Sequence, residues 1–149
     1  MTHELPMAHK MPYWGTGRSS PDVWIERTKD VIRKLGGANI QEAFGAADGR
    51  AAFMLRFEVG GETFKIVWPV LKVRHPKDEP AARVQAATLL YHDCKARAVS
   101  AAVLGTRTMF FHALELPGGK TVSEIATPEL AHAMPKLPLL AHLEDDDER

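Results

Sequence analysis

Basic side chains are the residues of this sequence best suited to chemistry, and that chemistry is anion binding. Arg56 and Lys65 are predicted to face each other across a hairpin, where directly opposed like charges are unfavourable. An anionic partner would relieve this conflict, and so would Glu58 together with another nearby acid. The basic surface predicted to bind a nucleic acid comprises Arg18, Arg56, Lys65, Lys72, Arg74 and Lys77.

The net charge of the chain agrees with such a surface once its acidic run is set apart. Residues 144–149 hold five of the 19 acids and one of the 19 bases, which leaves 14 acids, 18 bases and a charge of +4 in residues 1–143. This balance suits DNA or RNA as a partner. The sequence shows neither a signal-peptide pattern nor an apolar run of membrane-spanning length, so we expect a cytoplasmic protein without a membrane partner.

Recognisable catalytic and metal-binding patterns are missing from the sequence. The seven histidines include no pair at i, i+4, and the single cysteine, Cys94, falls on the apolar stripe of a predicted helix, where we expect it to be buried. Neither a nucleophile with an obvious base nor a phosphate-binding loop is found. We therefore predict no catalytic residue, metal or cofactor, and leave open an enzyme with a pocket lined by His92, Asp93 or His112.

Apolar residues outside the predicted elements point to another kind of partner, a protein. Residues 1–19 contain prolines and glycines without helical or strand periodicity, which predicts an irregular arm. Its rings, Tyr13 and Trp14, either pin the arm to the body of the protein or contact a partner. Leu139 and Leu140 lie in a leucine-rich segment punctuated by prolines. A partner protein or a second copy of this chain would contact these residues.

Two long helices are predicted from their boundary residues. Ser20 suits the N-cap and Pro21 the first position of a helix that ends at Gly36. Pro80 opens a second helix that runs to Gly105. Apolar residues recur at spacings of three and four in both, which predicts that each packs one face against a sheet.

The sheet is predicted from alternation between apolar and polar residues. A strand near residues 39–44 precedes a clear alternation over residues 51–59, and Gly60 with Gly61 suits a two-residue hairpin turn. The returning strand ends at Pro69.

The turn fixes the register of this hairpin. With Gly60 and Gly61 at its centre, Phe57 faces Phe64 and Arg56 faces Lys65. On this basis a Lys65→Glu substitution is expected to stabilise the hairpin slightly and to weaken the binding of an anionic partner.

Together these elements predict an α+β fold. It contains a three-stranded antiparallel sheet with two main helices packed on one face, in the order α-β-β-β-α. Residues 106–116 suit either a strand or a short helix, and a short C-terminal helix is predicted to begin at Thr127, Pro128 and Glu129. The predicted organisation is an arm over residues 1–19, a single domain over 20–143 and an acidic tail over 144–149.

Short motifs between residues 18 and 140 also follow a familiar order. They are Arg18 and Ser19; Leu35, Gly36, Gly37 and Ala38; Arg56, Phe57, Gly60 or Gly61, and Phe64; Pro69; Lys95 and Ala96; Leu116, Pro117, Gly119, Thr121 and Val122; and Met134, Pro135, Leu137, Pro138, Leu139 and Leu140. This order resembles a family of small proteins of unassigned function encoded by phages, prophages and mobile elements. That family carries an acidic run where this chain has residues 108–112.

The resemblance implies a short helix over the ambiguous residues 106–116. Its phage setting implies a non-enzymatic accessory protein associated with nucleic acid. The alternative is a protein-protein interaction module, either an inhibitor or adaptor of a host or phage protein or a homo-oligomer.

Overall fold

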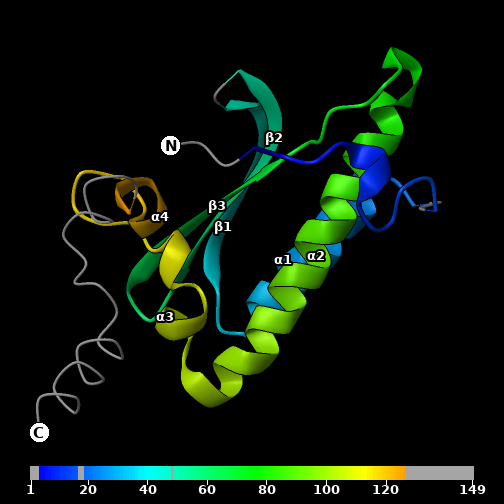
Figure 1. The fold of residues 1–149 in the computed structure, drawn as a ribbon. Helices are drawn as coiled ribbons and strands as arrows, with labels where there is room; N and C mark the ends of the chain where they lie inside the picture. The colour runs from blue at the N-terminus through cyan, green and yellow to red at the C-terminus, as the bar shows by residue number, and fades with distance from the viewer. Residues whose placement is uncertain (1–3, 17–18, 48, 127–149) are drawn as a thin grey trace, which may run out of the picture.

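A three-stranded sheet and two long helices make up the framework of the protein (Figure 1). The computed structural model describes residues 4–16, 19–47 and 49–126. The strands are β1 (Ala38–Ala47), β2 (Arg50–Val59) and β3 (Glu62–Pro69), and the long helices are α1 (Pro21–Lys34) and α2 (Glu79–Leu104). Shorter elements are η1 (Ala8–Lys10), η2 (Pro76–Asp78), α3 (Thr106–Met109), η3 (Phe111–Ala113) and α4 (Val122–Ile125).

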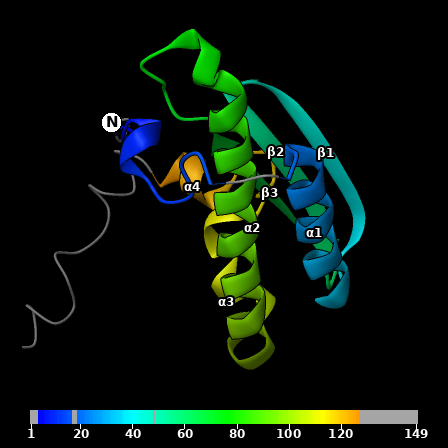
Figure 2. The same cartoon turned by 90° about the vertical axis from the view of Figure 1, so that its right-hand side faces the viewer.

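The sheet is antiparallel, with strands in the order β1-β2-β3. Helices α1 and α2 pack side by side on one of its faces, so the predicted α+β fold and the order α-β-β-β-α are confirmed (Figure 2). None of the helices in the described ranges is long and apolar enough to cross a membrane.

The predicted hairpin register is confirmed residue by residue. Phe57 lies opposite Phe64, with ring centroids 5.5 Å apart, and Arg56 lies opposite Lys65. Gly60 and Gly61 have φ angles of 59° and 80°, the left-handed conformations that a tight turn between twisted strands requires.

Strand β1 is longer than the sequence predicted and is less regular. It pairs with β2 over its length, but the register shifts between Ala38 and Gln41, where Asn39 adopts a φ of 51°. Since β2 lies between the other two strands, β1 and β3 form the two edges of the sheet.

The core joins the inner face of the sheet to both helices. Phe57 and Phe64 meet Leu90 and Cys94 of α2, and all four are fully buried. Helix α1 contributes Ile25, Thr28 and Ile32. A Cβ on Gly37 would lie 2.3 Å from Ile32 Cγ2, so glycine is required where the chain leaves α1. Ser20 occupies the N-cap position without a side-chain hydrogen bond to the helix.

The ambiguous residues 106–116 contain both kinds of structure. Helix α3 and the 3₁₀ turn η3 come first, as the resemblance implied, and Leu114 then forms an isolated antiparallel bridge with Phe64 of β3. A capping box between Thr121 and Glu124 opens α4, a short helix toward the C-terminus. The helix start predicted at Thr127 lies outside the described residues.

The arm packs on the body, which confirms the pinning alternative for its rings. Gln85 of α2 is fully buried and its Nε2 donates to the carbonyl oxygens of Ala8, Met11 and Pro12 at 2.8, 3.2 and 3.0 Å. Tyr13 stacks on His92 with ring centroids 4.9 Å apart, and Trp14 packs against the cluster around Ala8, Leu71 and Ala82.

Candidate functional site

Arg56 and Lys65 lie on the sheet face away from the helices, and each is paired with an acid. Arg56 donates from Nε and Nη2 to the two carboxylate oxygens of Glu115, at 2.9 and 3.1 Å. Lys65 Nζ lies 3.4 Å from Glu124 Oε1. Acids therefore screen the opposed bases, as the alternative held, but the acids that pair with them are Glu115 and Glu124, which follow α3. Glu58, which the alternative named, instead accepts a hydrogen bond from Asn39.

The Arg56–Glu115 pair is the stronger of these two contacts. The Glu115 side chain is only 14% exposed, and the hydrogen bond from Arg56 holds the pKa of this carboxyl below its usual value. Two bases and two acids thus neutralise one another on this face, so its local charge is close to zero.

The other predicted basic residues lie at the opposite end of β3. Lys72, Arg74 and Lys77 are exposed on the connector between β3 and α2, and η1 brings Lys10 to the same region, because the Ala8 amide donates to the Lys72 carbonyl at 2.9 Å. Burial, with the charges of Arg74 and Lys10, lowers the pKa of His9 between them. Among the described residues, none of these four cations forms an ion pair.

The predicted basic surface is therefore divided into two separate groups. Arg56 and Lys65 form a paired group beside α4, and Lys72, Arg74 and Lys77 form a second group on the connector that has no ion pair within residues 4–16, 19–47 and 49–126. Arg18 lies outside the described residues, as do Leu139 and Leu140.

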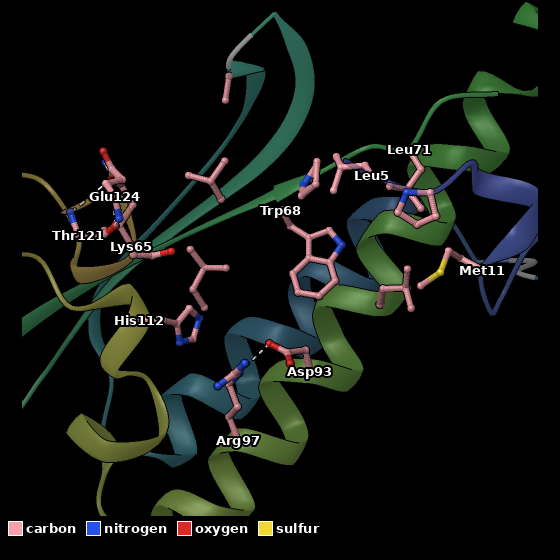
Figure 3. Close-up of a pocket in the computed structure, with 17 residues that line it drawn as sticks. Leu5, Met11, Lys65, Trp68, Leu71, Asp93, Arg97, His112, Thr121 and Glu124 are labelled. Carbon is pink, nitrogen blue, oxygen red and sulfur yellow. Dashed lines mark hydrogen bonds and ion pairs between the residues drawn. The ribbon is translucent and has the colours of Figure 1, made fainter. Parts of the chain in front are cut away.

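A groove of about 690 Å³ runs between the outer edge of β3 and α2 (Figure 3). Trp68 lies in its middle, Lys65 and Glu124 at one end, and Leu5 and Leu71 at the other. Its apolar lining includes Leu5, Pro6, Met11, Ile66, Val67, Trp68, Pro69, Leu71 and Leu89.

Among the described residues, the edge of β3 along this groove has no strand partner beyond its first residues. The Glu115 amide donates to the Thr63 carbonyl at 2.8 Å, and the Val70 amide, on the other side, donates to Ala51 of β2 at 2.8 Å. Since backbone direction alternates along a strand, Lys65 and Val67 share the outward direction of Thr63. Within the described part of the chain, no strand pairs with β3 outward of residues 66–69.

A polar corner closes the α2 side of the groove. Leu89, Asp93 and Arg97 are spaced by four residues on α2 and so form one row. Arg97 Nε donates to Asp93 Oδ2 and its Nη1 to the Met109 carbonyl, both at 2.9 Å. Burial and the charge of Arg97 lower the pKa of the neighbouring His112.

This corner holds an ion pair and an imidazole. Cys94 is fully buried in the core, where burial raises the pKa of its thiol to about 12. His92, the other histidine considered for a pocket, stacks on Tyr13 outside the groove. No cluster of three or more metal-ligating side chains gathers within residues 4–16, 19–47 and 49–126.

The groove was not predicted from the sequence, although two local signals concern residues that line it. The opposed bases Arg56 and Lys65 indicate that acidic side chains from another part of the chain pair with them. The spacing of Thr121 and Glu124 is that of a capping box, which indicates the start of a helix. Neither signal identifies residues 115–124 as the partners of β3.

Comparison of this chain with protein-family models, with curated proteins and with solved structures returns no match. The resemblance to phage-encoded proteins therefore stays a prediction.

Proposed function

We propose that this protein is a protein-interaction module that binds an extended apolar peptide segment along the outer edge of β3. The observation that supports the proposal is the coincidence of an apolar groove with a strand edge that pairs with no strand in the described part of the chain. Strand addition uses both features, because the backbone edge supplies hydrogen bonds and the groove accepts alternate side chains.

The dimensions of the site set the length of the bound segment. Residues 65–69 of β3 line the groove, and five residues of strand extend about 17 Å. One face of the incoming segment would contact Trp68 and Leu89, and the other would lie beside Val67, whose side chain is 44% exposed. The preferred ligand is therefore a short, apolar and uncharged segment.

Peptide selection on the intact chain tests this proposal. Phage-displayed peptides of about ten residues, long enough to cover the edge, are selected on the full-length protein, and fluorescence anisotropy measures their affinity. Val67→Pro removes an outward amide, which an edge strand tolerates, and should weaken binding about tenfold. Leu89→Glu, which places a charge in the apolar lining of the groove, should have a larger effect and abolish peptide binding.

Ala46→Pro is the matched control, because Ala46 lies at an outward position on the opposite edge, β1. It should leave peptide affinity unchanged. Circular dichroism verifies that each variant is folded. Equal losses in Val67→Pro and Ala46→Pro, or undiminished binding by Leu89→Glu, would contradict the proposed site.

Nucleic-acid binding remains a second candidate because of the unpaired cations on the connector. Lys10, Lys72, Arg74 and Lys77 would contact phosphates, and each contact should contribute about −0.7 to −0.9 to the slope of log affinity against log salt concentration. A labelled single-stranded oligonucleotide should then bind at about 50 mM salt and dissociate near 200 mM.

The charge-reversed variant Lys72→Glu/Arg74→Glu should abolish oligonucleotide binding, whereas Arg56→Gln, in the paired group, should preserve it. Binding that is insensitive to salt, or absent at low salt, would refute this candidate.

A further inference from the structure

We infer that a single-stranded nucleic acid binds a surface formed by the arm, α1 and α2, with an unpaired base stacked on Tyr13 and phosphates on Arg27 and Lys95. This aromatic surface comprises the rings of Tyr13, Trp24, Tyr91 and His92 and the cations Arg27 and Lys95. None of these six residues lines the groove beside β3, and none belongs to the connector. The site is therefore separate from the proposed peptide site and from the connector cations.

Four rings from three parts of the chain form one continuous cluster. Tyr13 of the arm lies almost parallel to His92 of α2, with an interplanar angle of 8° and ring centroids 4.9 Å apart. The Trp24 ring of α1 lies 5.3 Å from Tyr91 and 5.9 Å from His92 between centroids. The arm reaches this cluster from the groove side of α2 by crossing that helix toward α1 (Figure 2). Such a cluster suits unpaired bases, because every base has a π face that stacks on an aromatic ring.

Tyr13 ends the stack, and its backbone holds it at the surface. The residue is 39% exposed although one face of its ring lies on His92. Its φ is 67°, a conformation that bulky residues rarely adopt. Gln85 fixes the carbonyls of Met11 and Pro12 just before it. A turn alone would favour glycine at this φ, and strained residues of this kind cluster at binding sites. The outer face of the Tyr13 ring is thus available to an incoming base.

The two cations of the aromatic surface lack acidic partners in the described part of the chain. Arg27 Cζ lies 4.7 Å from the centroid of the Trp24 ring, and Lys95 Nζ lies 5.8 Å from that of Tyr91. Neither forms an ion pair within residues 4–16, 19–47 and 49–126. The rings attract both side chains without neutralising them, so each can contact a phosphate.

The acids nearest in sequence to these rings lie on other sides of their helices. Asp22 and Glu26 are each two residues from Trp24, about 200° around the axis of α1, and Glu26 is paired within that helix. Asp93 lines the groove and is paired there. The surface therefore combines exposed rings with positive charge, as single-stranded nucleic acids require. An apolar protein surface would bury both cations without partners, which is unfavourable.

Two oligonucleotides of equal charge separate base stacking from phosphate binding. An oligothymidylate of about twelve nucleotides and an abasic strand of the same length are titrated with the full-length protein, and fluorescence anisotropy measures both affinities. The thymidylate should bind about tenfold more tightly, through one stacked base. Tyr13→Gly should remove this preference, and Tyr13→Phe, which keeps the ring, should retain it. Glycine accepts a φ of 67°, so the arm can keep its conformation.

Charge removal tests the phosphate contacts. Arg27→Gln/Lys95→Gln should make the slope of log affinity against log salt concentration shallower by about 1.4, the effect of two lost phosphate contacts on a single strand. Arg33→Gln/Lys34→Gln removes the same charge from the last turn of α1 and is the matched control, which should leave the slope unchanged. Circular dichroism verifies that each variant is folded. A slope that changes equally in both double variants would overturn the assignment of phosphates to Arg27 and Lys95.

Photo-crosslinking locates the base. An oligonucleotide that contains 5-iodouracil is irradiated with the protein, and mass spectrometry should identify the modified residue as Tyr13 or His92. Crosslinks confined to residues 72–77 would overturn the inference and leave nucleic-acid binding by the connector standing. Equal affinity for the abasic strand, or a preference that survives Tyr13→Gly, would also overturn it.

Two further measurements keep this site distinct from other partners. Tyr13→Gly should leave the affinity of a selected peptide unchanged, so the aromatic surface and the groove can fail independently. If the chain binds no oligonucleotide and instead self-associates in a way that Tyr13→Gly abolishes, the aromatic surface contacts a second copy of the chain and the inference is overturned.

Discussion

The two edges of the sheet are chemically similar backbones in very different surroundings. Along β1, eight of the ten residues are exposed. The strand has an irregular register near Asn39, and Glu42 forms an ion pair with Lys29 of α1. Along β3, the Leu114 bridge covers the beginning of the edge. Residues of α2 and of the arm line the groove beside the rest of the edge.

The difference shows what turns a strand edge into a binding site. Natural sheets protect exposed edges with charges and bulges, and β1 has both. An edge lined by an apolar groove gains burial as well as hydrogen bonds when a segment adds to it, and of the two described edges β3 is the one that the groove lines along residues 65–69.

The largest expected difference between the edges is in stability. Phe110 is fully buried and its ring centroid lies 5.6 Å from that of Phe57, so it anchors the residues that bridge to β3. Phe110→Ala should cost about 3–5 kcal/mol in the free energy of unfolding, measured in urea. Phe44→Ala on β1, where the ring is 44% exposed, should cost under about 1 kcal/mol. Similar losses of stability in Phe110→Ala and Phe44→Ala would contradict the proposed difference between the two edges.

The arm supplies the next largest effect, because it forms the far wall of the β3 groove. Gln85→Leu removes the amide that donates to three arm carbonyls and should cost about 1–3 kcal/mol. Trypsin should then cleave after Lys10 faster than in the wild type. An unchanged cleavage rate would mean that apolar contacts alone hold the arm.

Low pH should lower the free energy of unfolding, because it protonates Glu115 beside β3. Arg56 lowers the pKa of Glu115 in the folded protein, so its contribution to stability is present above the unfolded pKa and is lost as pH falls through the folded value. In Glu115→Gln the free energy of unfolding should therefore depend less on pH below about 4.5. Arg56→Gln should have the same effect. If the free energy of unfolding of either variant depends on pH as steeply as that of the wild type, the Arg56–Glu115 pair does not cause this dependence.

The smallest expected effect reverses the expectation drawn from the hairpin alone. Lys65→Glu would place an acid beside Glu115 and Glu124, so it should destabilise the protein by a few tenths to about 1 kcal/mol. Lys65→Glu/Glu124→Lys should recover only part of the loss, because it restores the ion pair but removes the Glu124 side chain from the capping box of α4. A stabilised Lys65→Glu variant would show that the cross-strand contact with Arg56 outweighs repulsion from Glu115 and Glu124.

Local pattern was enough to predict the hairpin. The alternation in β2 and β3 and the two glycines between them fix which side chains oppose each other, and the structure agrees at every pair. Cys94 was likewise predictable as a buried residue, since its place on the helical stripe determines its burial.

The candidate site depends on contacts that no local pattern encodes. Arg56 and Glu115 are 59 residues apart in sequence, and neither identifies the other as its partner. The length of β1 was underestimated because alanines and a glycine carry little strand signal. The groove arises only when the arm, β3 and α2 are assembled.

The late bridge at Leu114 also has a kinetic consequence. The three strands are consecutive in sequence and close short loops, whereas the bridge must wait until residues far along the chain return to β3. Such a late, small contact can open while the hairpin stays paired. Hydrogen exchange should then show the Glu115 amide exchanging faster than the amides shared between β2 and β3, and transient opening would lengthen the free edge toward Thr63.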